Sequence, residues 1–108
     1  DDRLGAIEDF DKAIELDSLY SIAYVNRAFS KKLIHDFNGA VLDYDKAISI
    51  DSLNPIFYYD RAEIRMEMGD AAGACRDWLI SRDLGFDIPD YHDLIDSYCD
   101  SNLNYNSN

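Results

Sequence analysis

The sequence predicts an all-α protein built from antiparallel helix pairs that follow one another along the chain. Three observations predict this fold: a repeat of 34 residues, apolar side chains at helical spacing within each copy, and capping residues at repeated positions. Seven of the ten residues from Gly5 to Ile14 recur unchanged from Gly39 to Ile48, and a more diverged copy begins at Gly73. A fixed period of roughly 20 to 50 residues is the signature of a repeat architecture.

The segments between these copies repeat with the same period. Residues 24–28 align with residues 58–62, and Pro55 and Pro89 are also 34 residues apart. Each full repeat therefore contains two helices, one in the intervening segment and one in the copy that follows. We expect helices at 3–16, 20–34, 37–50, 55–68, 71–84 and 89–100.

Turn and capping residues mark where these helices begin. Asp36 and Asp70 stand where an N-cap side chain would accept a backbone hydrogen bond. Gly69 suits a left-handed helix end, and His35, one repeat earlier, is expected to fill the same turn rather than take part in chemistry. Pro55 suits a first helical turn, where a missing N–H costs nothing.

The period, and the pattern of an aromatic residue, a small residue and then Ala-x3-aromatic-x2-Ala, resemble the tetratricopeptide repeat. The resemblance covers about residues 4–86 and is closer to bacterial members than to eukaryotic co-chaperones. The chain departs from the family at Ser18 and Ser52, where proline is usual, and at Arg27 and Arg61, where leucine is frequent. The matching positions are Ala6, Phe10, Ala13, Tyr24, Ala28, Ala40, Tyr44, Ala47, Tyr58, Ala62, Ala74, Trp78 and Ser81, the last in place of alanine.

This resemblance implies an α-α superhelix, a tetratricopeptide-like solenoid that binds proteins or peptides in a concave groove. We expect one repeat domain over 1–100, closed by a capping helix and followed by a disordered polar tail. Because the first helix lacks an upstream partner, we also expect further repeats before Asp1 in a longer product. The parts are a partial repeat at 1–20, full repeats at 21–54 and 55–88, the cap at 89–100 and the tail at 101–108.

The last helix has one apolar face and one charged face, which is what the end of a helical stack needs. The apolar face carries Tyr91, Leu94, Ile95, Tyr98 and Cys99. The charged face carries His92, Asp93, Asp96 and Asp100.

Arginines and acidic residues recur together in the repeats. We expect Arg27 and Arg61 to pair with the recurrent acids Asp9, Asp43 and Asp77. In this interpretation the arginines hold helices together and do not bind a partner.

The formal net charge of −12 comes from 22 acidic and 10 basic residues. Nucleic-acid phosphates and anionic membranes both attract basic surfaces, so the composition disfavours both as partners. No stretch approaches the ~20 apolar residues of a membrane span. The acidic balance indicates a solvated exterior that attracts basic partners.

No arrangement of residues predicts catalysis, a metal site or a bound cofactor. The two histidines, His35 and His92, lie in different repeats, and the acid pairs recur within helices without a calcium loop's closing glutamate. Cys75 and Cys99 form neither a metal spacing nor a disulfide framework. We therefore expect two buried thiols, with a bond between them as the alternative in an oxidising compartment.

In the family, the groove is lined by the first helix of each pair. We therefore expect a partner to bind one face of the helices at 20–34 and 55–68. That face is apolar with acidic points, and contiguous exposed apolar surface usually marks an interaction site. Its residues are Ile22, Val25, Asn26, Phe29, Lys32, Leu33, Ile56, Tyr59, Asp60, Glu63 and Met66.

The resemblance also implies individual roles and exclusions. Asn26 would hydrogen-bond a partner's backbone. Relatives that hold chaperone carboxylate tails have a lysine and an arginine where this chain has Ile56 and Asp60, so the resemblance disfavours that partner class. Partial burial between helices is the alternative to partner contact for Phe29, Leu33 and Met66.

These observations favour a non-catalytic scaffold module that binds a protein or peptide with apolar and basic side chains. Two other roles stay open. The domain is a structural spacer or regulatory segment of a larger multi-domain protein in one, and a self-association module acting through its open first helix in the other.

Overall fold

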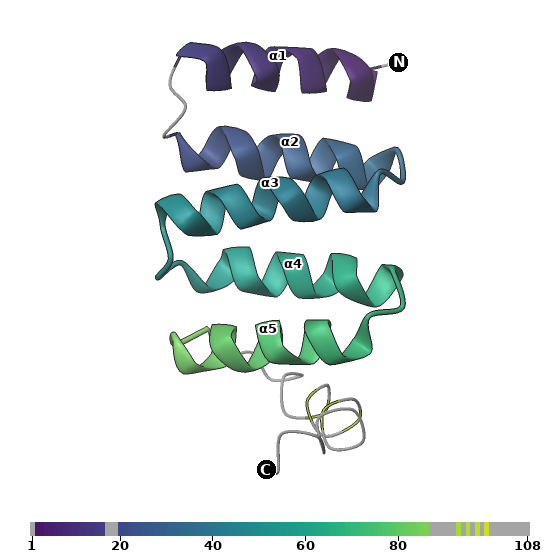
Figure 1. The fold of residues 1–108 in the computed structure, drawn as a ribbon, viewed down its shortest axis with the longest axis vertical. Helices are drawn as coiled ribbons and strands as arrows, with labels where there is room; N and C mark the ends of the chain where they lie inside the picture. Colours follow the sequence, from purple (N-terminus) through teal and green to yellow (C-terminus); the bar gives the residue numbers. More distant parts are fainter. Residues whose placement is uncertain are drawn as a thin grey trace. The chain divides into compact units, whose positions relative to one another are not determined.

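The computed structural model describes residues 2–16 and 20–86 together with Asp93, Ile95, Ser97 and Cys99. Within these residues the chain is all-α, as predicted, and no strand occurs. The five helices predicted between residues 3 and 84 are confirmed (Figure 1). Most of the predicted helix at 89–100, with Pro89, and the whole tail at 101–108 lie outside the described residues. The helices are α1 (Asp2–Leu16), α2 (Ser21–Leu33), α3 (Phe37–Ile50), α4 (Pro55–Glu67) and α5 (Ala71–Asp83).

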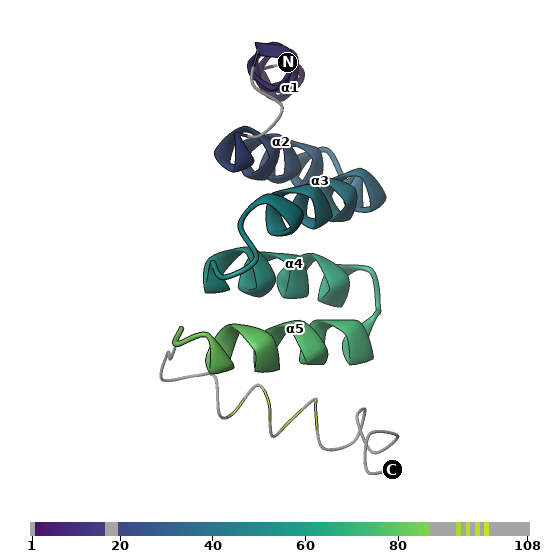
Figure 2. The ribbon, with the colours of Figure 1, turned by 60° about the vertical axis from the view of Figure 1, so that its left-hand side comes forward.

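The helices belong to two compact units. The first unit, Asp1–Leu53, contains α1, α2 and α3, and the second, Asn54–Asn108, contains α4 and α5. Within the first unit α2 packs against both α1 and α3, and within the second α4 packs against α5. Figures 1 and 2 show α2 with α3, and α4 with α5, as antiparallel pairs joined by tight turns.

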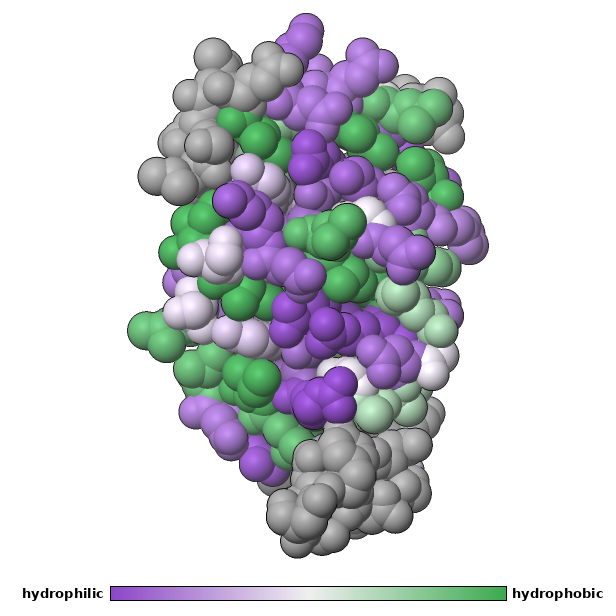
Figure 3. All heavy atoms as spheres, in the orientation of Figure 1, coloured by the Kyte–Doolittle hydropathy of each residue, from purple (hydrophilic) through white to green (hydrophobic). Residues whose placement is uncertain are grey.

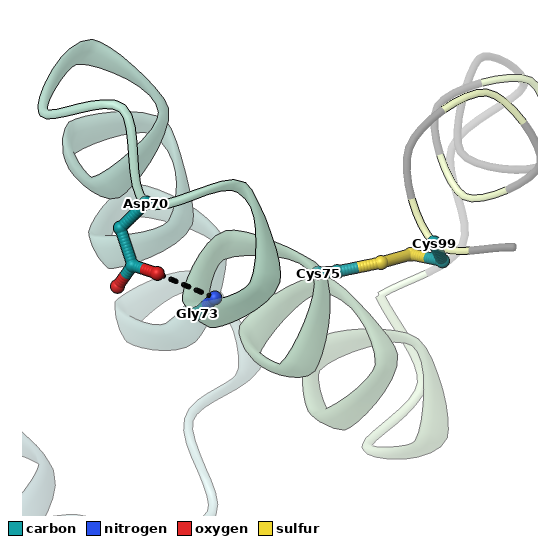
Figure 4. Close-up of a disulfide and its surroundings, with 4 residues drawn as sticks. All are labelled: Asp70, Gly73, Cys75 and Cys99. Atoms are coloured by element: carbon teal, nitrogen blue, oxygen red, sulfur yellow. Dashed lines mark hydrogen bonds between the residues drawn. A yellow bond between two sulfur atoms is a disulfide. The ribbon is translucent and has the colours of Figure 1, made fainter. Parts of the chain in front are cut away.

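The second helix of each pair begins at a capping aspartate. The Asp36 carboxylate accepts a hydrogen bond from the Gly39 backbone N–H at 3.0 Å. Asp70 accepts one from the Gly73 N–H at 2.9 Å (Figure 4). A Cβ atom added at either glycine would overlap the capping carboxylate. The repeated glycine is therefore explained by the space that the repeated cap requires.

The turns before these helices need a left-handed residue. His35 has a φ of 66° and Gly69 a φ of 83°, so both fill the turn as predicted. The His35 ring packs edge-on against Phe37, with ring centroids 5.5 Å apart. The first helix of the second pair starts as expected: the Asn54 side chain accepts a hydrogen bond from the Ile56 N–H at 3.0 Å, and Pro55 occupies the first turn.

Alanines and aromatic residues form the core of each pair. Ala28, Ala40 and Ala47 are completely buried between α2 and α3, where Tyr44 is buried beside them. Small side chains let two helix backbones approach closely, and the rings fill the remaining space. The second unit uses the same arrangement, with buried Ala62, Ala74, Tyr58 and Trp78.

A buried carboxylate joins α2 to α3 in the first unit. The Asp43 side chain is 4% exposed and accepts two hydrogen bonds from Arg27, at 2.9 and 2.6 Å. Lys31 lies 3.2 Å from the same carboxylate. The hydrogen bond to Asp43 is the main cause that raises the pKa of Arg27, so Arg27 remains charged.

The same arginine reaches back to α1, but to a different acid from the one expected. Arg27 Nη1 donates to Asp11 at 2.7 Å, whereas the sequence favoured Asp9, which is exposed. Two residues along a helix turn a side chain by about 200°, so Asp9 and Asp11 lie on opposite sides of α1.

The second unit repeats this arrangement one period later. Arg61 donates two hydrogen bonds to Asp77, at 2.9 and 2.8 Å, and Arg65 donates a third at 2.8 Å. The Asp77 side chain is 1% exposed. The predicted pairs of Arg27 with Asp43 and of Arg61 with Asp77 are therefore confirmed.

The two cysteines are bonded to each other. Cys75 on α5 and Cys99 form a disulfide, with Cα atoms 5.4 Å apart (Figure 4). Both residues are buried, as expected, but the preference for two separate thiols was wrong. Of the predicted cap residues that the structure describes, Ile95 and Cys99 are buried and Asp93 is exposed. Tyr91, His92, Leu94, Asp96, Tyr98 and Asp100 lie outside the described residues.

We predict that Asp43→Ala lowers the free energy of unfolding by about 3 kcal/mol, because Arg27 and Lys31 lose the carboxylate they share. Asp9→Ala removes the same charge from an exposed position and should change stability by less than about 0.5 kcal/mol. Urea unfolding followed by circular dichroism measures both. Equal losses in the two variants would contradict a special role for Asp43.

We also predict that Asp36 and Gly39 are energetically coupled. Asp36→Ala should cost about 1 kcal/mol through loss of the cap. Gly39→Ala should not stabilise the native sequence, because its methyl group displaces the capping carboxylate. In the Asp36→Ala background the same substitution should stabilise by up to about 1 kcal/mol, as helix propensity dictates. A double-mutant cycle in urea measures the coupling, and additive effects would refute it.

Candidate interaction surface

The faces predicted to bind a partner belong to the first helix of each pair. None of the described helices is long and apolar enough to cross a membrane. Among the described residues, no three histidine, cysteine or acidic side chains gather in a way that would hold a metal ion. The features to examine are therefore the helix surfaces themselves.

The α2 face presents exposed apolar side chains beside a lysine. Phe29 is 53% exposed, and Ile22 and Leu33 are exposed as well. The ammonium of Lys32 lies 5.9 Å from the centre of the Phe29 ring, within reach of a cation–π interaction. For Phe29 and Leu33, exposure therefore prevails over burial between helices. Asn26 is also exposed, and Val25 and Lys32 are half-buried.

The α4 face combines an exposed isoleucine with acidic side chains. Ile56 is 47% exposed and Glu63 is exposed, while Asp60 is half-buried. Tyr59 and Met66 are half-buried because one side of each packs against the core of the second unit. Burial was the alternative proposed for Met66, and it holds in part.

The arginine–aspartate pairs determine which side of each helix faces outward. Arg27 turns toward Asp43, so a residue two positions away lies about 200° around the helix and points to the opposite side. Phe29 has this relation to Arg27, and Tyr59 has it to Arg61.

The structure also exposes apolar residues that the sequence interpretation missed. Leu42 is 67% and Leu53 is 73% exposed. The position of Leu42 carries Glu8 and Arg76 in the other copies, and that polar variation was the available signal that it faces water. On the face shown in Figure 3, hydrophobic residues form several separate patches among hydrophilic ones.

Comparisons with known proteins place the fold. No family model matches this chain, and no curated protein matches it by sequence. The solved structure of the Yersinia enterocolitica type III secretion chaperone SycD, in complex with a peptide of the translocator YopD, has a TM-score of 0.76 and 18% identity. The match covers 94% of this chain and 78% of the SycD chain.

Two further structures give similar values. PcrH, in complex with the chaperone binding region of PopD, has a TM-score of 0.75 at 18% identity, over 98% of this chain and 80% of PcrH. MamA has a TM-score of 0.81 at 18% identity, over 97% of this chain, which spans 61% of the MamA chain. At this level of identity the likeness concerns the fold. This chain has the tetratricopeptide-like helical-repeat fold.

Proposed function

We propose that this chain is a non-catalytic module that binds a protein or peptide through the outward faces of α2 and α4. The observation that carries the proposal is the exposure of large apolar side chains on these helices, above all Phe29 and Ile56. Contiguous exposed apolar surface usually marks an interaction site.

The binding energy would come from desolvation of these apolar anchors. Phe29, Ile22 and Leu33 offer an apolar strip on α2, and Ile56 offers one on α4. A partner's apolar side chains would cover this surface, and the gain scales with the area removed from water. Asn26, exposed on the same helix, would hydrogen-bond the partner's backbone.

The charges on α4 would select among apolar partners. Asp60 and Glu63 lie on its outward face, and the chain as a whole carries a net charge of −12. A partner with basic side chains would associate faster and more specifically than an acidic one, and this advantage would weaken as salt is added.

The similar structures support this class of function. SycD is described with a peptide of YopD, and PcrH with the chaperone binding region of PopD. The shared fold makes a bound peptide a reasonable occupant for this chain too. The identity of the partner rests on this chain's own surface chemistry.

The proposal predicts which peptides bind and which variants lose them. On an array of peptides, this chain should retain those with apolar and lysine- or arginine-rich sequences over matched apolar and acidic ones. Phe29→Ala and Ile56→Ala should each weaken binding about tenfold, equivalent to about 1.4 kcal/mol. Fluorescence anisotropy with a labelled peptide measures the dissociation constants.

The controls are the exposed leucines outside both faces. Leu42→Ala and Leu53→Ala remove as much exposed apolar surface and should leave affinity within about twofold. Equal loss in all four variants would place the site elsewhere. Absence of any bound peptide would favour the spacer role, and a rise in mass with concentration during sedimentation would favour self-association through α1.

A further inference from the structure

The Cys75–Cys99 disulfide lies directly behind the α4 face. Both cysteines belong to a buried cluster with Ala62 of α4, Trp78 of α5 and Ile95. The remaining buried member of the cluster is Ala74. The bond therefore joins the C-terminal segment to the core on which α4 rests, as Figure 4 shows for Cys75 and Cys99.

Two residues of the α4 face pack against this same cluster. Tyr59 and Met66 contact it from α4, and Leu79 and Phe86 contact it from α5 and the turn after it. The rings of Tyr59 and Phe86 meet edge-on, with centroids 5.3 Å apart. A change in the C-terminal segment would thus reach Tyr59 and Met66 through direct packing.

The repeat pattern shows what the disulfide replaces. In the first unit, Asp11 of α1 and Arg27 of α2 form an ion pair. Two periods later the same positions hold Leu79 and Ile95, which are apolar.

The second basic position of each ion-pair cluster changes in the same way. Lys31 contacts Asp43, and Arg65 contacts Asp77. One period after Arg65 the chain has Cys99. The C-terminal segment therefore lacks the arginine and the second base found in α2 and α4, and it has an apolar contact and a covalent bond instead.

We propose that the Cys75–Cys99 disulfide is a redox latch that controls the α4 face. In the oxidised state the bond holds Ile95 and Cys99 on the core and keeps Tyr59 and Met66 packed in place. In the reduced state the segment opens, the two side chains lose their support, and the face binds its partner more weakly. Side chains fixed before binding lose less conformational entropy when a partner binds.

The opening reaction is thiol–disulfide exchange with a dithiol. A thiolate of the dithiol attacks one sulfur, forms a mixed disulfide and releases the other cysteine as a thiolate, which takes up a proton. The second thiol of the reagent then displaces the remaining cysteine. Overall the protein gains two electrons and two protons, and the dithiol becomes a disulfide. Because both cysteines are buried, the attack follows local opening of the segment.

Trp78 reports the state of the latch without any partner. It is the single tryptophan of the chain, it is 3% exposed, and it belongs to the cluster that holds both cysteines. Reduction with dithiothreitol should raise the quenching of its fluorescence by acrylamide about twofold or more. A titration of free thiols in the same sample establishes that two cysteines have been reduced.

The matched control is the double variant Cys75→Ala, Cys99→Ala. Without reductant it should already show the quenching of the reduced wild type, and dithiothreitol should not change it. If two thiols are titrated and quenching stays at the oxidised level, or if the double variant behaves like the oxidised protein, the latch is refuted.

The second measurement concerns binding and rests on the proposed function. The probe is a labelled synthetic peptide of alternating leucine and lysine pairs, and its dissociation constant should rise about fivefold or more upon reduction. Equal affinity in the two states, with quenching increased, would refute the control of the α4 face. Absence of binding in both states would refute the proposed function, and increased quenching would still support the latch itself.

Discussion

Each helix pair is organised around one buried carboxylate. Asp43 and Asp77 are almost completely removed from water, and a carboxylate in that position is strongly destabilising unless cations and hydrogen bonds compensate it. Arg27 and Arg61 supply both, with two hydrogen bonds each. This requirement fixes the rotation of the first helix in each pair against the second. The outward side of α2, with Phe29, is a consequence of that rotation.

The sequence was sufficient for the fold because its signals are local and repeated. The caps at Asp36 and Asp70, the left-handed turn at His35 and the period of 34 residues each constrain the backbone independently. The partner of Arg27 on α1 was wrong by two residues, because a period places helices in order without fixing how each is rotated about its axis. Exposure of Phe29 was left open by the sequence for the same reason.

The end of the chain follows different rules from its middle. A repeat stack must cover its last apolar surface, and here the ion pairs give way to Ile95 and a disulfide. Two cysteines separated by 24 positions carry no pattern that distinguishes a bond from two thiols, so only the three-dimensional arrangement decides between them. Covering the end of the stack and supporting the α4 face thereby depend on the same side chains.

The central claim is that the outward faces of α2 and α4 bind, while the paired charges only hold the helices together. The most direct test is a titration of ¹⁵N-labelled protein with an apolar, lysine-rich peptide, followed by NMR chemical shifts. The account predicts that the largest shifts fall on the backbone amides of Asn26, Phe29, Ile56 and Glu63. Largest shifts on the exposed side of α3, around Leu42, would contradict it.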